Sequence, residues 1–311
     1  MKTLPMILRR PQVILMLIAL LLLVITFTKP TLELERSSYR YVFVFDISQS
    51  MNVMDVPETD ESITRLEYAK KMTLEALSEM PCGTEAGLAL FTGHRAFLLI
   101  TPVEICNSHR ELSVMINNID WRMTWKARSE IAKGLFKSIT LLEKLDQTTR
   151  LVFITDGHES PPINPEIPPR FPGELGKING LIVGVGGNEP VQIPKFNKKT
   201  GKEEGFWEEK DVQHTDVYSQ ANAGADTVTT GTEHLSSLRE TYLEGLADKT
   251  GLIYHRLGSS EDLFDEMETR DLSIPKTSTA DMRWLFALGA LLLFIATYFI
   301  EYFKKLKFLD R

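Results

Sequence analysis

Two long apolar segments, one near each end of the chain, constrain its architecture more than any other feature. Residues 11–28 contain no charged side chain, and neither do residues 284–300. A helix needs about 20 apolar residues to cross the ~30 Å hydrocarbon core of a bilayer, and both segments are close to that length. We therefore predict one transmembrane helix at residues 11–28 and another at residues 284–300.

Each apolar segment also has a second interpretation. The first resembles the apolar part of a secretory signal peptide, but ITFTKPT offers no good small-residue cleavage site, which favours an uncleaved anchor. The second would also suit a buried core helix. Trp284 and Tyr298 near its ends, and the lysines beyond it, favour a membrane span with aromatic and cationic anchors.

Basic residues flank the two predicted spans on the sides nearest the chain ends. They are Lys2, Arg9, Arg10, Lys304, Lys305 and Lys307. The positive-inside rule then predicts that residues 1–10 and 301–311 are cytoplasmic. Residues 29–280 would form a domain on the other side of a bacterial inner membrane, in the periplasm. The net charge of -7 falls mostly on this domain, which argues against nucleic-acid binding.

Short apolar runs alternate with helix-length segments in this domain. The runs at residues 41–45, 151–155 and 181–185 are continuous, as in strands that are buried on both faces. Another strand is expected at LIYHRL. The expected helices are residues 65–80, 108–119, 129–145, 236–249 and 261–267. This alternation predicts an α/β fold with a doubly wound, mostly parallel sheet.

Two segments of the domain fall outside this alternation. Residues 186–232 are polar and rich in Gly, Lys and Glu, without a helical stripe. We expect a β-hairpin insertion or a long loop there. Residues 271–280 are predicted to be a linker to the second span.

The two cysteines, Cys82 and Cys106, flank a predicted hairpin. Strand-like runs at residues 86–91 and 96–100 are separated by Gly-His-Arg, and the cysteines are symmetric about residue 94. A hairpin that turns there brings both cysteines to the same end. In an oxidising compartment this predicts a disulfide, with two free buried thiols as the alternative.

Carboxylates and hydroxyls follow two of the buried strands. The first strand ends in DISQS, with Asp46, Ser48 and Ser50 at alternate positions, and LVFIT is followed by Asp156. Parallel strands end at the same edge of a sheet, so we expect both carboxylates there. Mg²⁺ prefers such oxygen ligands and keeps several waters. Taken alone, DISQS is more typical of side chains that cap a turn or a helix.

The combination of DISQS and a later buried strand ending in TDG resembles the von Willebrand factor A domain, with its metal-ion-dependent adhesion site. SMNVMDV before TRLEYAKK, the strand LALFTGHRAFLLITP and IVGVGG are similar to the bacterial membrane-anchored group that includes the Bat proteins. The two flanking spans also resemble that group. The resemblance covers residues 40–268 as the domain core, with residues 186–232 as an insertion.

The resemblance implies a set of metal ligands. The family has a fifth position, usually Thr in a Gly-Thr-Asp loop, and it corresponds to Ser129 in KARSEIAKGLF. Arg128 and Glu130 replace the neighbours of that Thr. Arg128 would either weaken metal binding or point at an acidic partner. His158 is expected to face solvent rather than to bind metal. The implied ligands of Mg²⁺, with Ca²⁺ and Mn²⁺ as alternatives, are Asp46, Ser48, Ser50, Ser129 and Asp156.

Such a site implies protein binding rather than catalysis, because a partner's carboxylate completes the coordination of the metal. The chain looks most like the MxaL-type proteins of bacterial methanol-oxidation gene clusters. This likeness implies other von Willebrand A proteins, a MoxR-type AAA+ ATPase and periplasmic methanol dehydrogenase as partners, with a role in calcium insertion.

Two other functions stay open at the level of the sequence. One is a Bat-type component of an envelope or stress-tolerance complex, unrelated to methanol oxidation. The other is a Mg²⁺-dependent hydrolase. Haloacid-dehalogenase phosphatases need a second Asp two residues after the first, and the chain has Ser48 there, which argues against that enzyme class.

Overall fold

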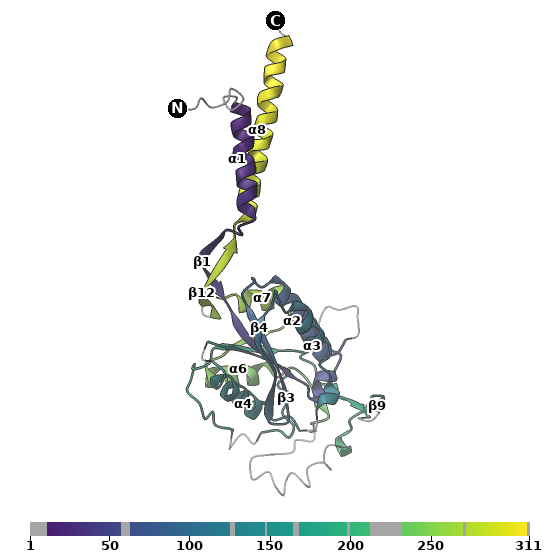
Figure 1. Cartoon of the computed structure of the whole chain (residues 1–311). Coiled ribbons are helices and arrows are strands. Elements are labelled where there is room, and N and C mark those ends of the chain that lie inside the picture. Colours follow the sequence, from purple (N-terminus) through teal and green to yellow (C-terminus); the bar gives the residue numbers. More distant parts are fainter. Residues whose placement is uncertain are drawn as a thin grey trace. The chain divides into compact units, whose positions relative to one another are not determined.

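The computed structural model describes residues 11–56, 63–124, 128–146, 148–163, 168–197, 200–211, 232–269 and 272–309 (Figure 1). The chain divides into two compact units. The larger unit runs from Ser37 to Ile274, and the smaller one contains the segments on either side of it.

A six-stranded sheet forms the centre of the larger unit. Neighbouring strands are parallel except for β3 and β4, which form an antiparallel hairpin on one side of the sheet. The strands, in spatial order, are β11 (Ile253–Arg256), β6 (Gly180–Gly184), β5 (Arg150–Thr155), β2 (Arg40–Asp46), β3 (Glu85–Thr92) and β4 (Arg95–Glu104). The structure confirms the predicted α/β fold with a mostly parallel sheet.

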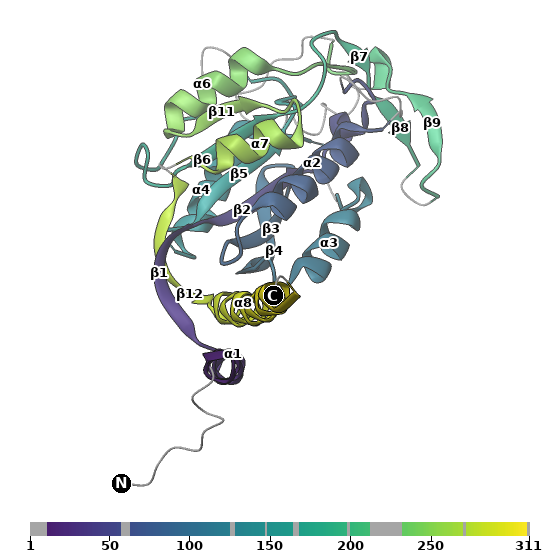
Figure 2. The same ribbon diagram turned by 90° about the horizontal axis from the view of Figure 1, so that it is seen from above.

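Helices cover both faces of this sheet (Figure 2). One face packs against α2 (Arg65–Glu79), α3 (His109–Asn117) and α7 (Ser260–Met267). The opposite face packs against α4 (Ile131–Glu143) and α6 (Glu240–Thr250). Along β2, Phe43 faces the first layer and Val44 the second, and both are fully buried. Burial on both faces explains why the strand reads as an uninterrupted apolar run.

Helix α2 begins with a capping box. Thr64 accepts a hydrogen bond from the backbone nitrogen of Glu67, and the Glu67 carboxylate accepts one from the backbone nitrogen of Thr64. This reciprocal pair satisfies backbone groups that the first helical turn leaves free. It also fixes Arg65 as the first residue of α2, beside the end of the sheet that carries Asp46.

The structure corrects two of the predicted boundaries. The helix expected at 236–249 begins only at Glu240, because Leu235–Ser236 form β10, which pairs with β7 (Val191–Gln192). The expected linker 271–280 is wrong over most of its length, since Ile274–Asp281 form β12 and pair with β1 (Thr31–Ser38). Both strand pairs join segments that are distant in the sequence.

The expected hairpin in the insertion is present. Strands β8 (Pro194–Phe196) and β9 (Glu203–Phe206) pair antiparallel. Residues 212–231 of the insertion lie outside the described residues.

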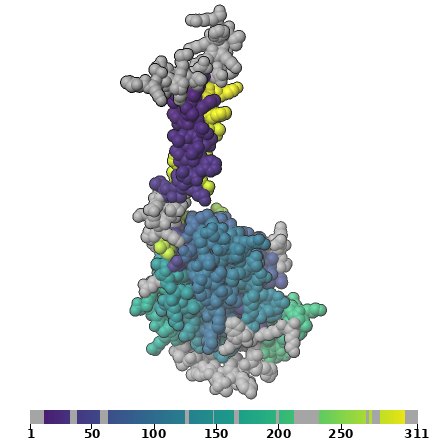
Figure 3. Space-filling view, viewed as in Figure 1, coloured from purple at the N-terminus to yellow at the C-terminus, as the bar shows by residue number. Residues whose placement is uncertain are grey.

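The smaller unit contains α1 (Pro11–Thr26) and α8 (Arg283–Leu309), which pack side by side (Figure 3). Within α8, Arg283–Ile300 have a mean hydropathy of 1.9, and this is the one helix of the described chain long and apolar enough to cross a membrane. Helix α1 has 16 residues, so it is shorter than the predicted span 11–28. It ends at a turn before Pro30, where Lys29 has φ 49°. The predicted cytoplasmic segment 1–10 lies outside the described residues.

A disulfide joins Cys82 to Cys106, with the two Cα atoms 5.5 Å apart. The hairpin of β3 and β4 turns at Gly93, where φ is 68°, so both cysteines lie at its open end. That end is at the edge where the parallel strands begin. We call it the amino edge, and we call the opposite edge, where β2 and β5 end, the carboxyl edge.

Candidate metal centre

Asp46 ends β2 at the carboxyl edge, with its side chain fully buried. Its Oδ1 accepts a hydrogen bond from the backbone nitrogen of Ser48 at 2.8 Å, and its Oδ2 accepts one from the Thr155 hydroxyl at 2.7 Å. Burial and the nearby charge of Asp156 raise the pKa of Asp46 to about 7, although these hydrogen bonds oppose the shift. A neighbouring cation would stabilise the ionised form of a carboxylate in this environment.

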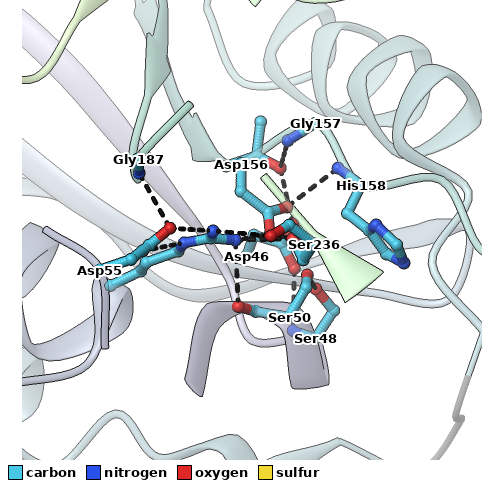
Figure 4. A network of polar contacts seen from close by, with 11 residues as sticks. Asp46, Ser48, Ser50, Asp55, Asp156, Gly157, His158, Gly187 and Ser236 are labelled. Atoms are coloured by element: carbon cyan, nitrogen blue, oxygen red, sulfur yellow. Dashed lines mark hydrogen bonds and ion pairs between the residues drawn. The ribbon is translucent and has the colours of Figure 1, made fainter. Parts of the chain in front are cut away.

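Ser48 and Ser50 follow at the start of a short 3₁₀ helix, η2 (Gln49–Asn52). Both are buried, and their hydroxyl oxygens are 3.1 Å apart. Figure 4 shows these two side chains beside Asp46 and Asp156. The alternate spacing of DISQS therefore brings one carboxylate and two hydroxyls together.

Asp156 follows β5 and is also fully buried. Its Oδ1 accepts a hydrogen bond from the backbone nitrogen of His158, and its Oδ2 accepts bonds from Arg65 Nη1 at 2.6 Å and from the Ser236 hydroxyl at 2.9 Å. Burial raises the pKa of Asp156, but the charge of Arg65, with smaller effects of His158 and Ser50, lowers the pKa overall. Asp156 is therefore held ionised beside Asp46.

Ser129 is tied to the same edge by its backbone. Its nitrogen donates to Ser160 O at 2.8 Å, and Ser160 N donates to Ser129 O at 2.7 Å. The next residue, Glu130, donates its N–H to Gly93 O. Ser129 thus lies between the end of β3 and the loop that follows Asp156, the two elements on either side of Asp46. Its hydroxyl is buried and has no hydrogen-bond partner among the described residues.

Arg128 is turned toward Glu130. Its Nη2 lies 3.5 Å from the Glu130 carboxylate, which also pairs with Lys133 at 2.6 Å. This acidic neighbour balances the positive charge that the sequence places next to Ser129.

The side chains at this edge fit a hard divalent cation. The five candidate ligands offer carboxylate and hydroxyl oxygens only, which are the ligands that Mg²⁺ prefers. A buried hydroxyl without a partner is costly, and a cation would satisfy the Ser129 oxygen. The residues that the sequence suggested as ligands, Asp46, Ser48, Ser50, Ser129 and Asp156, all lie at the carboxyl edge.

Charged groups that the sequence did not predict as part of the site lie beside these oxygens. Arg65 is fully buried and forms two parallel bonds to Asp55, Nε to Oδ1 at 2.7 Å and Nη2 to Oδ2 at 2.5 Å. Ser236, from β10, bonds to both Arg65 and Asp156. The only signal for Asp55 and Arg65 was their place in SMNVMDV and TRLEYAKK, and Ser236 gave none.

The expectation that His158 faces solvent is wrong. The residue is only 5% exposed, and its backbone nitrogen is held by Asp156. Arg239, just before α6, donates its backbone N–H to Asp156 O at 2.9 Å. Burial lowers the pKa of His158 against the opposing charge of Asp156. The ring lines a cavity of about 320 Å³ together with Glu159 and Tyr242.

Comparison with known families agrees with this geometry. Residues 41–158 match the family described as von Willebrand factor type A domain. The matched residues contain the whole candidate ligand set, from Asp46 to Asp156, and also Arg65.

Several solved structures are similar to the chain. An aerotolerance-related membrane protein from Bacteroides fragilis is 18% identical with a TM-score of 0.48, over 73% of this chain and 96% of that chain. The conserved hypothetical protein BatB from Bacteroides thetaiotaomicron is 18% identical with a TM-score of 0.49, over 74% and 95%. No curated protein matches the chain.

Proposed function

We propose that this chain is a membrane-anchored protein that binds partner proteins through a divalent cation held by its von Willebrand factor type A domain. The observation that supports this most is the gathering of buried oxygens at the carboxyl edge. They come from the loop after β2, the loop before α4 and the loop after β5. No short segment of the chain could supply such a set alone.

Each group would have a separate task in cation binding. The hydroxyls of Ser48, Ser50 and Ser129 would be ligands, and Asp46 and Asp156 would supply the negative charge. Mg²⁺ is the cation we expect, with Ca²⁺ and Mn²⁺ as alternatives. When bound, the cation offers an open position to a carboxylate of the partner. Because charges interact more strongly away from water, one such bond can carry much of the binding energy of an interface.

We place the larger unit in the periplasm, anchored in the inner membrane by α8 and assisted by α1. The apolar stretch Arg283–Ile300 supports the anchor. The disulfide between Cys82 and Cys106 supports an oxidising compartment, since disulfides persist there and are rare in the cytosol.

At the finest level, we propose a role in the maturation of periplasmic methanol dehydrogenase, with a MoxR-type ATPase and other von Willebrand A proteins as further partners. The motif resemblance to MxaL-type proteins supports this. A Bat-type envelope complex is the competing assignment, and it uses the same cation site with different partners.

A pull-down from membranes of the source organism tests both levels. The tagged full chain, its Asp46→Ala variant and its Asp146→Ala variant are compared, each with Mg²⁺ and with EDTA. Asp146 is a matched control, because it pairs with Arg40 at the amino edge. We expect the wild type and Asp146→Ala to retain partners in Mg²⁺ only, and Asp46→Ala to retain none.

The proteins recovered identify the function. Methanol dehydrogenase or its maturation factors would support the finer proposal, and envelope proteins lost in EDTA would support the Bat-type assignment. Recovery of the same proteins in all six samples would overturn the cation-dependent mechanism.

A further inference from the structure

The proposed function gives no task to Arg65, a charged group at the carboxyl edge. Its guanidinium is fully buried, which is rare for arginine, and the structure surrounds it with oxygens. Besides its two bonds to Asp55, Nη1 donates to Asp156 Oδ2 at 2.6 Å, to the Ser236 hydroxyl at 2.7 Å and to Ser50 O at 3.3 Å. It therefore bonds to both the DISQS loop and the second candidate carboxylate.

The backbone around Arg65 leaves just enough room for these bonds. Gly186, which follows β6 with φ 125°, has no side chain, and a Cβ there would lie 2.5 Å from Arg65 Nε. Gly187 donates its N–H to Asp55 Oδ2 at 3.0 Å. The loops after β2, β5 and β6 thus meet on one guanidinium and its two carboxylates. A bidentate arginine suits this position because its five donors lie in a rigid plane.

The charges at this edge suggest what Arg65 does. Three carboxylates, Asp46, Asp55 and Asp156, and the Arg65 guanidinium lie together at this edge, so these four groups carry two negative charges when all are ionised. One divalent cation neutralises that group. Without Arg65 the loaded site would still carry a negative charge, which would repel the carboxylate of a partner.

We propose that the positive charge of Arg65 sets the net charge of the metal site. It keeps Asp55 and Asp156 in place when no metal is bound, and it leaves the metal-loaded site neutral so that a partner's carboxylate is accepted. Arg65 is thus a positioning residue. Its charge lowers the affinity of the site for the cation, but it allows the loaded site to bind an acidic partner. This inference rests on the proposed function, because it assumes that a cation binds beside Asp46.

Binding of Mn²⁺ to the full chain in detergent, followed by the loss of the free-ion EPR signal, tests the charge argument. Arg65→Met leaves three negative charges and should bind Mn²⁺ roughly tenfold more tightly than the wild type or better. Asp55→Asn leaves one and should bind roughly tenfold more weakly. Arg65→Met/Asp55→Asn restores two negative charges and should return the affinity to near that of the wild type.

Arg40→Met is the matched control. Arg40 also pairs with two carboxylates, Glu85 and Asp146, but at the amino edge. Its loss should leave Mn²⁺ affinity unchanged. A purely structural role for Arg65 could weaken Mn²⁺ binding in Arg65→Met, but it could not strengthen it.

The outcomes separate the two proposals. If the wild type binds no Mn²⁺, the proposed function fails. If the wild type binds and a folded Arg65→Met binds no more tightly, the inference about Arg65 is overturned while the proposed function stands. If Arg65→Met does not fold, Asp55→Asn and the double variant decide: equal affinity of Asp55→Asn and the wild type overturns the inference.

Discussion

Arg40 and Arg65 form similar ion-pair groups at opposite edges of the sheet, but in different surroundings. Arg40 opens β2 at the amino edge, and its side chain is 31% exposed beside Glu85 and Asp146. Arg65 is fully buried at the carboxyl edge beside Asp55 and Asp156. Partly exposed ion pairs contribute little to stability. Buried ion pairs must offset a large desolvation penalty through their mutual attraction and hydrogen bonds. The buried ion pairs, which carry the larger desolvation cost, therefore lie at the edge where we propose that the cation and the partner bind.

The largest expected effect follows directly from this difference in burial. In EDTA, Arg65→Met should lower the free energy of unfolding by about 3–5 kcal/mol, because it leaves buried carboxylates without a positively charged partner. Arg40→Met should lower it by no more than about 1 kcal/mol. Urea unfolding of the full chain in detergent, followed by tryptophan fluorescence, measures both. Equal losses in the two variants would contradict the comparison.

The disulfide gives the next largest effect, and it acts at the amino edge only. Cys82 and Cys106 are 24 residues apart, so replacing both with Ser should cost about 3 kcal/mol of stability through the greater freedom of the unfolded chain. Cation binding should be unchanged, because the bond is at the far end of the hairpin from Asp46. A changed Mn²⁺ affinity in the folded Cys82→Ser/Cys106→Ser variant would show that the two edges are coupled.

Two glycines with positive φ provide a smaller contrast between the edges. Gly186→Ala places a Cβ against Arg65 and should cost about 1–3 kcal/mol through overpacking, with weaker Mn²⁺ binding. Gly83→Ala, at the amino edge, has φ 99° but meets no atom within 4 Å. It should show only the cost of backbone strain, on the order of 1 kcal/mol, and normal Mn²⁺ binding. Unfolding and EPR titrations on both variants check this pair.

The two edges also differ in how far their side chains could be predicted from the sequence. The buried strands were predicted because continuous apolar runs are local signals, and Asp46 and Asp156 were expected at one edge because parallel strands end together. The contacts of Arg65 with Asp156 and Ser236 span 91 and 171 residues. No local pattern shows which distant carboxylate will neutralise a buried arginine.

Distant pairing also explains the incorrect boundary of α6 and the incorrect exposure of His158. Ser236 pairs with Val191 in a short antiparallel ladder, and that pairing delays the helix that periodicity predicts. Arg239 and Tyr242, at the start of α6, line the same cavity as His158, which reads in the sequence as a residue of an exposed loop. Ser129 could be chosen only through its resemblance to a family position, because its bonds to Ser160 are equally non-local.

The smallest effect concerns pH, and it has opposite signs at the two edges. Near the carboxyl edge, burial raises the pKa of Glu159 to about 7, although Tyr242 and the backbone N–H of Ala132 donate hydrogen bonds to it. A carboxyl with a raised pKa stabilises the fold fully below its unfolded value of 4.5, and this contribution is lost as pH rises to about 7. At the amino edge, hydrogen bonds from Thr148 and the charge of Arg40 lower the pKa of Asp146. Its contribution is lost as pH falls instead.

Glu159→Gln isolates the effect at the carboxyl edge, because the Gln carbonyl can still accept the bond from Ala132. Relative to the wild type, this variant should gain on the order of 1 kcal/mol of stability as pH rises from 4.5 to above 7. The stability of Asp146→Asn should instead fall relative to that of the wild type as pH rises from the acid range. Unfolding curves at a series of pH values measure both differences. If Glu159→Gln and the wild type ran parallel across this range, the Glu159 carboxyl would not be held protonated by burial.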